Sequence, residues 1–198
     1  MTDKTLIYAD PITVNCRKVL AGMAFLDAPF ERVHVDYFKG EHKEPAYLAV
    51  NPNASVPTLA EGNFVLWESN AILQYVADKL GRNSAYPKDL QTRADINRWL
   101  LWESSSWFPN CYSFLVENCV KPLLGSTADP AVLEAQTLQF NKLAGFVADA
   151  LVGARPGWLL SALAPHALEE AAGAHAQHVT GERYRPVLLV PTNPARWP

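Results

Sequence analysis

The segment from residue 51 to residue 80 contains two residue pairs that could bind a small peptide. Ser69 stands where a helix-like run begins, and the free amides and positive dipole of a helix start would hold a carboxylate. Glu68 beside it could hold an ammonium group. Pro57 opens a strand-like run, and a cis bond after Val56 would turn the Val56 backbone outward to pair with an extended peptide. The pairs predict a receptor for an α-amino acid head and an extended amide, as in a γ-glutamyl peptide.

Each of these residues also has a simpler interpretation when it is taken alone. Ser69 is a common residue type at a helix start, where its hydroxyl caps free amides. Pro57 could form an ordinary trans bond at the start of a strand, because only about 5–6% of X-Pro bonds in folded proteins are cis. The peptide-binding interpretation therefore depends on all of these residues occurring together.

The elements that would position these pairs follow one another as strand, helix, strand, hairpin and helix. The spacing of apolar residues predicts a β-α-β unit from segments 5–9, 13–28 and 30–36. Two strand-like runs then meet at a turn containing Gly62, and a helix follows with Gly81 as its expected C-cap. The first part of the chain is therefore expected to be an α/β domain.

The strand signals stop after a segment of Gly, Pro and polar residues that suits an interdomain linker. One helical stretch is expected over residues 89–124, with a kink near Pro109. A second helix is expected over residues 130–151, with Asp129 as its cap. The predicted division is a first domain over residues 1–80, a linker over 81–88 and an all-helical domain over 89–198.

The composition favours a globular protein that acts on small molecules or proteins. The 198 residues are 49% hydrophobic, enough for a sizeable core, and the net charge is −3 at pH 7. Binding to nucleic-acid phosphates needs a basic excess, so no nucleic-acid partner is expected. The sequence predicts neither a secretory signal nor a membrane span, and its three cysteines suggest neither a disulfide framework nor a metal site. These features together predict a cytoplasmic protein without a bound metal.

The order of elements, the motifs "NPNASVPTL" and "LWESNAIL" and the all-α second half resemble the cytosolic glutathione S-transferase superfamily. The segment "DYFKGEHKEPAYLAVNP" is most similar to its phi-like and bacterial groups. The resemblance implies a thioredoxin-like first domain, a homodimer, and detoxification by conjugation of glutathione to a small hydrophobic electrophile. It assigns the cysteinyl backbone of glutathione to Val56 and Pro57, the γ-glutamyl head to Glu68 and Ser69, and the glycyl carboxylate to His42 and Lys43. Without the family, His42 and Lys43 could clamp a carboxylate just past a strand, although a solvated charge run is the simpler interpretation.

The catalytic position in these groups is a serine between the first strand and the first helix, and Thr13 occupies it here. Threonine keeps the hydroxyl donor that would stabilise the glutathione thiolate, but it adds a methyl group and a stiffer χ1 angle. A fall of about two units in the thiol pKa, worth roughly 2.7 kcal/mol, would make the thiol mostly thiolate at pH 7. Asn15 is a second polar candidate near this position.

Two other functions are compatible with the sequence. Cys16, three residues after Thr13, could serve a glutathione-dependent thiol reductase, although a cysteine one turn inside a helix more simply packs against the sheet. A glutathione-binding or partner-binding protein of the same fold without catalysis is also compatible, because Thr13 replaces the usual serine.

A hydrophobic co-substrate is expected to bind between the domains. Trp102 and Ser106 are four residues apart, so they share a helix face that could line this site. Trp107 is a further candidate, although some of the tryptophans must belong to the core.

The ending of the chain departs from the family pattern after about residue 155. It has no capping box before an apolar run, and Pro165 could start a different helix. A shifted reading frame or a divergent ending would produce such a segment. We expect residues after about Gly181 to be extended or poorly ordered, which would expose apolar surface on the helices around Trp99 and Leu143.

Overall fold

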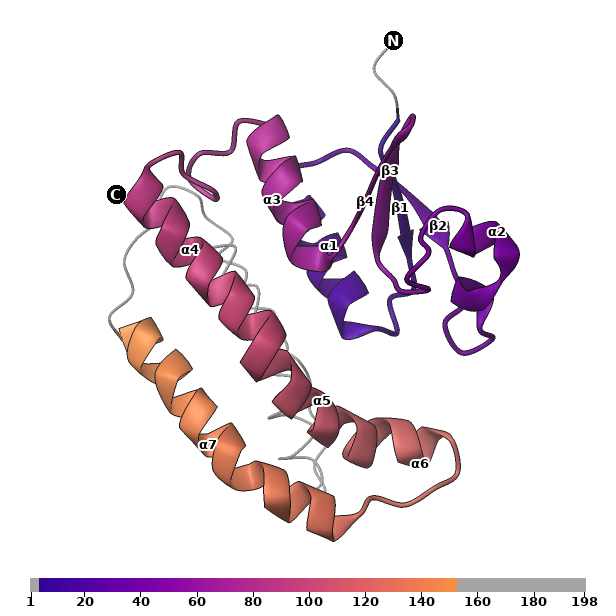
Figure 1. Cartoon of the computed structure of the whole chain (residues 1–198), viewed down its shortest axis with the longest axis vertical. Coiled ribbons are helices and arrows are strands. Elements are labelled where there is room, and N and C mark those ends of the chain that lie inside the picture. Colours follow the sequence, from indigo (N-terminus) through magenta and orange to yellow (C-terminus); the bar gives the residue numbers. More distant parts are fainter. Residues whose placement is uncertain (1–3, 153–198) are drawn as a thin grey trace.

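In the part of the chain that the structure describes, the first half folds as a four-stranded mixed sheet with helices, and the second half is helical (Figure 1). The structure is a computed structural model and describes residues 4–152. It confirms the predicted fold class of an α/β unit followed by an all-α part. The departures expected after residue 155, with a helix starting at Pro165 and a loose ending after Gly181, lie outside the described residues.

The directions of the four strands bring several loops to one end of the sheet. The strands, in the order β2-β1-β3-β4, are β1 (Leu6–Ala9), β2 (Glu31–His34), β3 (Thr58–Glu61) and β4 (Phe64–Trp67). β1 and β2 run parallel, whereas β3 runs antiparallel to β1 and to β4. Strands β1, β2 and β4 therefore end where β3 begins. We name this end of the sheet the Ala9 end and the opposite one the Leu6 end.

Two helices, α1 (Val14–Phe25) and α3 (Ser69–Lys79), pack side by side against the sheet. Their buried faces carry apolar residues at helical spacing, for example Val19 and Met23 on α1 and Ile72 and Val76 on α3. Burial of each large aliphatic side chain stabilises the fold by about 1.5–3 kcal/mol. Because α1 follows β1 and α3 follows β4, both helices begin at the Ala9 end and run toward the Leu6 end.

Helix α3 ends at Lys79 with Leu80 as its C-cap, so the predicted cap residue Gly81 is the residue that follows the cap. Gly81 has a φ of 64°, a left-handed conformation that glycine adopts without steric cost. The amide of Arg82 donates to the Ala77 carbonyl oxygen at 2.8 Å, and the Gly81 amide donates to the Asp78 carbonyl oxygen at 3.1 Å. This pair of bonds satisfies carbonyl groups that the helix end would otherwise leave free.

The chain between β2 and β3 forms two short helical turns that the sequence analysis did not predict. They are the 3-10 turn η1 (Glu41–Lys43) and the four-residue helix α2 (Pro45–Leu48). Proline is well suited to the first position of a helix, because its φ is already helical and that amide needs no partner. The Glu41 side chain accepts a hydrogen bond from the Asp36 amide at 2.6 Å, which holds the start of this segment.

The second half is one long helical run followed by a long helix beside it (Figure 1). Its elements are α4 (Leu90–Trp102), the π-helical turn η2 (Glu103–Trp107), α5 (Phe108–Leu115), the π-helical turn η3 (Val116–Val120), α6 (Lys121–Leu123) and α7 (Pro130–Val152). Pro109 and Pro122 each follow a π-helical turn within two residues. A π turn widens the helix where a proline ring would strike the carbonyl four residues earlier, which accounts for the predicted irregularity near Pro109.

The predicted helix over 130–151 is confirmed as α7. Asp129 is its cap, because one carboxylate oxygen accepts a hydrogen bond from the Ala131 amide at 2.9 Å.

The two halves share a continuous interface. Ile96 and Leu100 of α4 belong to the same buried cluster as the core residues of α1 and α3. A buried ion pair crosses the interface, with Lys18 of α1 and the Glu103 carboxylate 3.1 Å apart. Asn70 of α3 donates to the same carboxylate at 3.1 Å. The division at residues 81–88 stays a prediction.

Candidate functional site

The candidate residues of the first half gather at the Ala9 end of the sheet. The loops that follow β1, β2 and β4 and the loop that precedes β3 all lie there, as the strand register requires. Residues on these loops and at the helix starts are Thr13, Asn15, His42, Lys43, Val56, Pro57, Glu68 and Ser69. The fold therefore places at one end residues that are 56 positions apart in the sequence, Thr13 and Ser69 being the outermost.

Thr13 is the N-cap residue of α1. Its hydroxyl donates to the Asp10 carbonyl oxygen at 3.1 Å instead of capping the helix. Asp10 is buried, and its carboxylate accepts hydrogen bonds from the Ile12 amide at 3.0 Å and the Tyr37 amide at 2.9 Å. These bonds fix the turn that carries Thr13 to the loop that follows β2, so the position of the hydroxyl is well defined.

Ser69 and Asn15 join the first turns of α3 and α1. The Ser69 side chain is only 6% exposed, and its hydroxyl donates to the Asn15 side-chain oxygen at 3.5 Å, a long hydrogen bond. Glu68 precedes the helix with φ 74° and ψ 113°, a conformation that costs a non-glycine residue about 1–3 kcal/mol. The Glu68 side chain itself is exposed. The starts of α1 and α3, the Ser69 hydroxyl and the backbone of Glu68 therefore lie close together.

The Val56–Pro57 peptide bond is cis, which is the geometry that the peptide-binding hypothesis required. Among residues 4–152, no hydrogen bond reaches the amide or the carbonyl oxygen of Val56. The preceding loop is held by buried polar groups, because Tyr47 and Asn51 both donate to the Ser55 carbonyl oxygen, at 2.6 Å and 2.9 Å. A rigid loop therefore presents Val56 at the start of β3.

His42 and Lys43 lie side by side in η1 but differ in exposure. His42 is 5% exposed and stacks on the Tyr37 ring, with ring centroids 4.4 Å apart, whereas Lys43 is exposed. Burial, and to a lesser degree the neighbouring Lys43, lowers the pKa of His42, so the imidazole is neutral at pH 7. Its Nδ1 is buried and has no hydrogen-bond partner among the described residues.

The cysteines lie in different surroundings. Cys16 is fully buried, and this burial raises the pKa of its thiol even though Thr13 and Asp10 provide hydrogen bonds that oppose the shift. Burial and the nearby Glu103 carboxylate raise the pKa of Cys111 to about 12. Cys119 is exposed. Because a reactive cysteine needs an accessible thiolate, Cys16 is not suited to redox chemistry in this conformation.

The residues predicted to line a co-substrate site lie farther inside the helical half than the sequence suggested. Trp107 is fully buried and packs with Cys111 and Leu143, so its side chain is not accessible to a co-substrate in this structure. Trp102 is half-buried and its ring stacks on that of Trp107 at 5.9 Å. Ser106 is half-buried.

Other aromatic residues outside the core are more exposed than Trp107. Phe38, in the loop after β2, and Tyr112, on α5, are 48% and 42% exposed. The Phe108 and Tyr112 rings stack at 5.4 Å. Burial, and then the neighbouring Tyr37, raises the pKa of Tyr112. These partly exposed aromatic side chains are further candidates for contact with a co-substrate.

Sequence reasoning missed several residues that shape this site. Asp10, Tyr47 and Asn51 are polar residues that the core encloses, and composition alone gives no sign of their burial. The Asp10-Pro11 pair at the end of the first strand was the only available signal for the fixed turn before Thr13. Phe108 and Tyr112 were recognisable as a helical i, i+4 aromatic pair.

Residues 4–152 contain no helix that is long and apolar enough to cross a bilayer. Within the same residues, no three His, Cys, Asp or Glu side chains lie close enough to hold a metal ion.

Known proteins resemble this chain both in sequence and in structure. Residues 6–78 match the family described as glutathione S-transferase, N-terminal domain. Glutathione S-transferase 3 of Zea mays is 35% identical over 141 residues, which are 69% of this chain and 62% of the relative. The structure of a variant of human glutathione S-transferase T1-1 in its apo form is 31% identical in sequence, with a TM-score of 0.78. The match covers 90% of this chain and 78% of the human chain.

Human glutathione transferase theta-2, solved in complex with glutathione and an unknown ligand, is 28% identical with a TM-score of 0.76. That match covers 87% of this chain and 72% of theta-2. The chain spans about three fifths of the length of the first curated relatives that it matches.

Proposed function

Because the chain belongs to the cytosolic glutathione S-transferase superfamily, we propose that it conjugates glutathione to a hydrophobic electrophile at the Ala9 end of the sheet. In this reaction the glutathione thiol gives its proton to solvent. The thiolate sulfur forms a bond to an electrophilic carbon, and the leaving group departs with the electron pair of the broken bond.

The observation that carries this proposal is the meeting of two helix starts beside the unpaired backbone groups of Val56, just before β3. The Ser69–Asn15 contact joins the first turns of α3 and α1, and Val56 offers its free amide and carbonyl nearby at the start of β3. Two helix starts favour anions, here a carboxylate and a thiolate. A molecule that carries both groups, separated by an extended amide, is a γ-glutamyl-cysteinyl peptide.

The γ-glutamyl head would bind at the start of α3. Ser69 and the free amides of its helix turn would hold the α-carboxylate, and the exposed Glu68 carboxylate would hold the α-ammonium group. The strained backbone at Glu68 directs that residue to the helix start, a use of local strain that is common at binding sites. The human theta-2 structure solved with glutathione supports the same ligand for this chain.

The rest of the tripeptide would follow the loops at the same end. The amide and carbonyl groups of Val56 would pair with the cysteinyl backbone. Lys43 would attract the glycyl carboxylate, and the neutral His42 would donate a hydrogen bond to it. A neutral imidazole has one N–H group. Because Nδ1 of His42 is buried and has no partner among the described residues, the bound ligand would determine which ring nitrogen carries the hydrogen.

Thr13 would stabilise the thiolate. Its hydroxyl donates to the Asp10 carbonyl in this structure, so donation to sulfur requires rotation about the Cβ–Oγ1 bond. The start of α1 adds its dipole, and together they would lower the thiol pKa by about two units. The electrophile would contact partly exposed aromatic side chains, for which Phe38, Phe108 and Tyr112 are the candidates.

The burial of Cys16 leaves the reductase hypothesis without an accessible thiolate. The non-catalytic hypothesis, which rests on Thr13 in place of the usual serine, predicts glutathione binding without conjugation.

The family also supports a homodimer in the cytoplasm with a role in detoxification. Three side chains of the edge strand β4, Phe64, Val65 and Trp67, are 44%, 39% and 41% exposed, which suits a surface that a second copy covers. Light scattering of the purified chain at several concentrations tests this assembly, because a constant monomer mass would contradict it.

Steady-state conjugation kinetics with a panel of electrophiles, together with calorimetry of glutathione binding, test the proposed function. We expect turnover that Thr13→Ala slows and that Cys16→Ser leaves nearly unchanged. Thr13→Ser serves as the matched control, because it keeps the hydroxyl. Binding without turnover on the whole panel would favour the non-catalytic protein, and a loss confined to Cys16→Ser would favour the reductase.

A further inference from the structure

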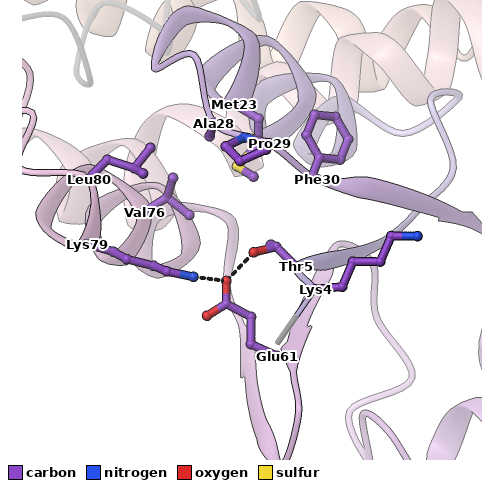
Figure 2. A pocket seen from close by; sticks show the side chains of 10 residues that line it. All are labelled: Lys4, Thr5, Met23, Ala28, Pro29, Phe30, Glu61, Val76, Lys79 and Leu80. Carbon is purple, nitrogen blue, oxygen red and sulfur yellow. Dashed lines mark hydrogen bonds and ion pairs between the residues drawn. The ribbon is translucent and has the colours of Figure 1, made fainter. Parts of the chain in front are cut away.

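A cavity lies at the Leu6 end of the sheet, where α1 and α3 terminate (Figure 2). Its volume is about 500 Å³, within the range of small-molecule sites. Thr13 and Met23 are ten residues apart on α1, so the cavity is about 15 Å along that helix from the candidate glutathione site. No residue of the candidate site lines it.

Most of the cavity wall is apolar. The lining side chains of this kind are Met23, Ala28, Pro29, Phe30, Val76 and Leu80. Figure 2 shows them on two sides of the opening, with the end of α1 on one side and the end of α3 on the other. An aromatic or alicyclic ring that enters this space would remove apolar surface from water on both sides.

The polar part of the cavity is a fixed ammonium group. The Glu61 side chain is only 9% exposed and accepts hydrogen bonds from the Tyr75 hydroxyl at 2.7 Å, from the Thr5 hydroxyl, and from Lys79 at 2.5 Å. Three donors thus occupy the carboxylate. Lys79 uses one of its three N–H groups on Glu61 and is 40% exposed. Its remaining N–H groups can donate to a ligand in the cavity.

The charges around this donor disfavour an ionic ligand. The Lys79 and Glu61 charges compensate each other. An anion attracted by Lys79 would be repelled by Glu61, and a cation attracted by Glu61 would be repelled by Lys79. The negative dipole ends of α1 and α3 oppose an anion, and Lys79 opposes a cation. The Lys4 ammonium pairs with Glu31 and points away from the opening in Figure 2. An uncharged acceptor is the group that fits beside Lys79.

We propose that this cavity binds a small apolar ring compound carrying one uncharged hydrogen-bond acceptor, such as a carbonyl group, which Lys79 holds. The site is separate from the conjugation site, and the proposal does not rest on the proposed function. It gives the chain a second ligand class, distinct from the anionic tripeptide.

The sequence provides a local reporter for the test. The chain has two methionines, Met1 and Met23, and Met23 lines the cavity. Protein labelled with ¹³C at the methionine methyl groups therefore gives two signals, and Met23→Leu identifies the one from the cavity. The full chain is titrated with acetophenone, with its near-isostere ethylbenzene, which lacks the acceptor, and with benzoate, which is anionic.

We expect acetophenone to shift the Met23 signal saturably, with an affinity of about 1 mM for a ligand of about nine non-hydrogen atoms. Ethylbenzene and benzoate should bind about fivefold more weakly, because the first lacks the hydrogen bond to Lys79 and the second meets Glu61. Saturating glutathione should not displace acetophenone. Displacement would place the ligand in the conjugation site and overturn the proposal.

Two variants separate the contribution of the Lys79 hydrogen bond to binding from that of the apolar cavity. Lys79→Leu should weaken acetophenone about fivefold and leave the initial response to ethylbenzene unchanged, whereas general damage to the fold would reduce both. Ala28→Leu narrows the opening and should reduce both responses. The proposal is overturned if acetophenone leaves the Met23 signal unchanged, if benzoate binds more tightly than acetophenone, or if Lys79→Leu has no effect on acetophenone.

Discussion

The two ends of the α1 and α3 pair differ in chemistry, although the same two helices form both. At the Ala9 end the helices begin, and Thr13, Asn15 and Ser69 place hydroxyl and amide groups around free backbone donors. At the Leu6 end the helices terminate, and Met23 and Leu80 line an apolar cavity. The first end suits anions and the second suits an uncharged ligand.

This difference illustrates how helix direction contributes to the chemistry of the two ends of one helix layer. Parallel helices add their dipoles, so their common starts are positive and their common terminations are negative. Sequence then strengthens each tendency, with Ser69 at the start of α3 and Lys79 at its end, where a cation compensates the dipole. The predictions below test whether the two ends behave independently.

The largest expected effect is a loss of overall stability, which would affect the sites at both ends. Glu103→Ala would leave Lys18 buried without its counter-ion, because the side chains of Lys18 and Glu103 are only 8% and 4% exposed. We expect a loss of about 3–5 kcal/mol in the free energy of unfolding, measured with urea. The double variant Lys18→Met with Glu103→Leu should recover most of this loss. A loss in Glu103→Ala similar to that of an exposed ion pair, below about 1 kcal/mol, would contradict the buried interface.

A smaller effect should be confined to the Ala9 end. Ser69→Ala removes a charge-assisted hydrogen bond to the glutathione carboxylate and should weaken binding by about 1.5–3 kcal/mol, measured by calorimetry. Lys79→Leu, at the opposite end of the same helix, is the matched control and should bind glutathione normally. Equal losses in the two variants would mean that the ends are not independent.

The smallest effect concerns the stability of the fold in acid. Stability should fall in two different pH ranges, one set by His42 near the Ala9 end and one by Glu61 at the Leu6 end. Burial lowers the pKa of His42 below its ordinary value of 6.5, so the unfolded chain takes up a proton first and stability falls as the pH falls below 6.5. Burial alone would raise the pKa of Glu61, but the bonds from Lys79, Thr5 and Tyr75 hold it below 4.5. Its contribution is therefore lost only as the pH falls below 4.5.

Urea midpoints measured across this pH range should show the two losses in that order. His42→Asn should remove only the loss that begins below pH 6.5, and Glu61→Gln only the one that begins below pH 4.5. An unchanged pH profile in His42→Asn would show that this histidine does not carry the first loss.

Much of the fold could be predicted because local patterns and global packing agree. The apolar runs of the strands, the glycine at the end of α3 and the proline that starts α7 each determine structure locally. The residues Glu68, Ser69, Val56 and Pro57 could be grouped because their chemistry is complementary to one ligand. Strand directions, which bring distant loops to the Ala9 end, followed once the β-α-β unit was assigned.

The exposure of the tryptophans in the helical half could not be predicted in the same way. Trp102 and Ser106 share a face of a regular α-helix, but the π turn Glu103–Trp107 rotates the residues beyond Trp102 relative to it. Tryptophans on several sides of one helix give no periodic signal, so the sequence does not tell which of them face the core. The cavity at the Leu6 end was equally hidden, because its walls come from four separate segments.

The central claim is that the Ala9 end binds glutathione as a thiolate, and the pKa of the bound thiol tests it most directly. The thiolate absorbance of glutathione bound to the full chain is titrated against pH, with Thr13→Ala and Thr13→Ser beside it. We predict a bound thiol pKa about two units below that of free glutathione, a return toward the free value in Thr13→Ala, and a low value in Thr13→Ser. A bound thiol that titrates like free glutathione in the unmodified chain would contradict the claim.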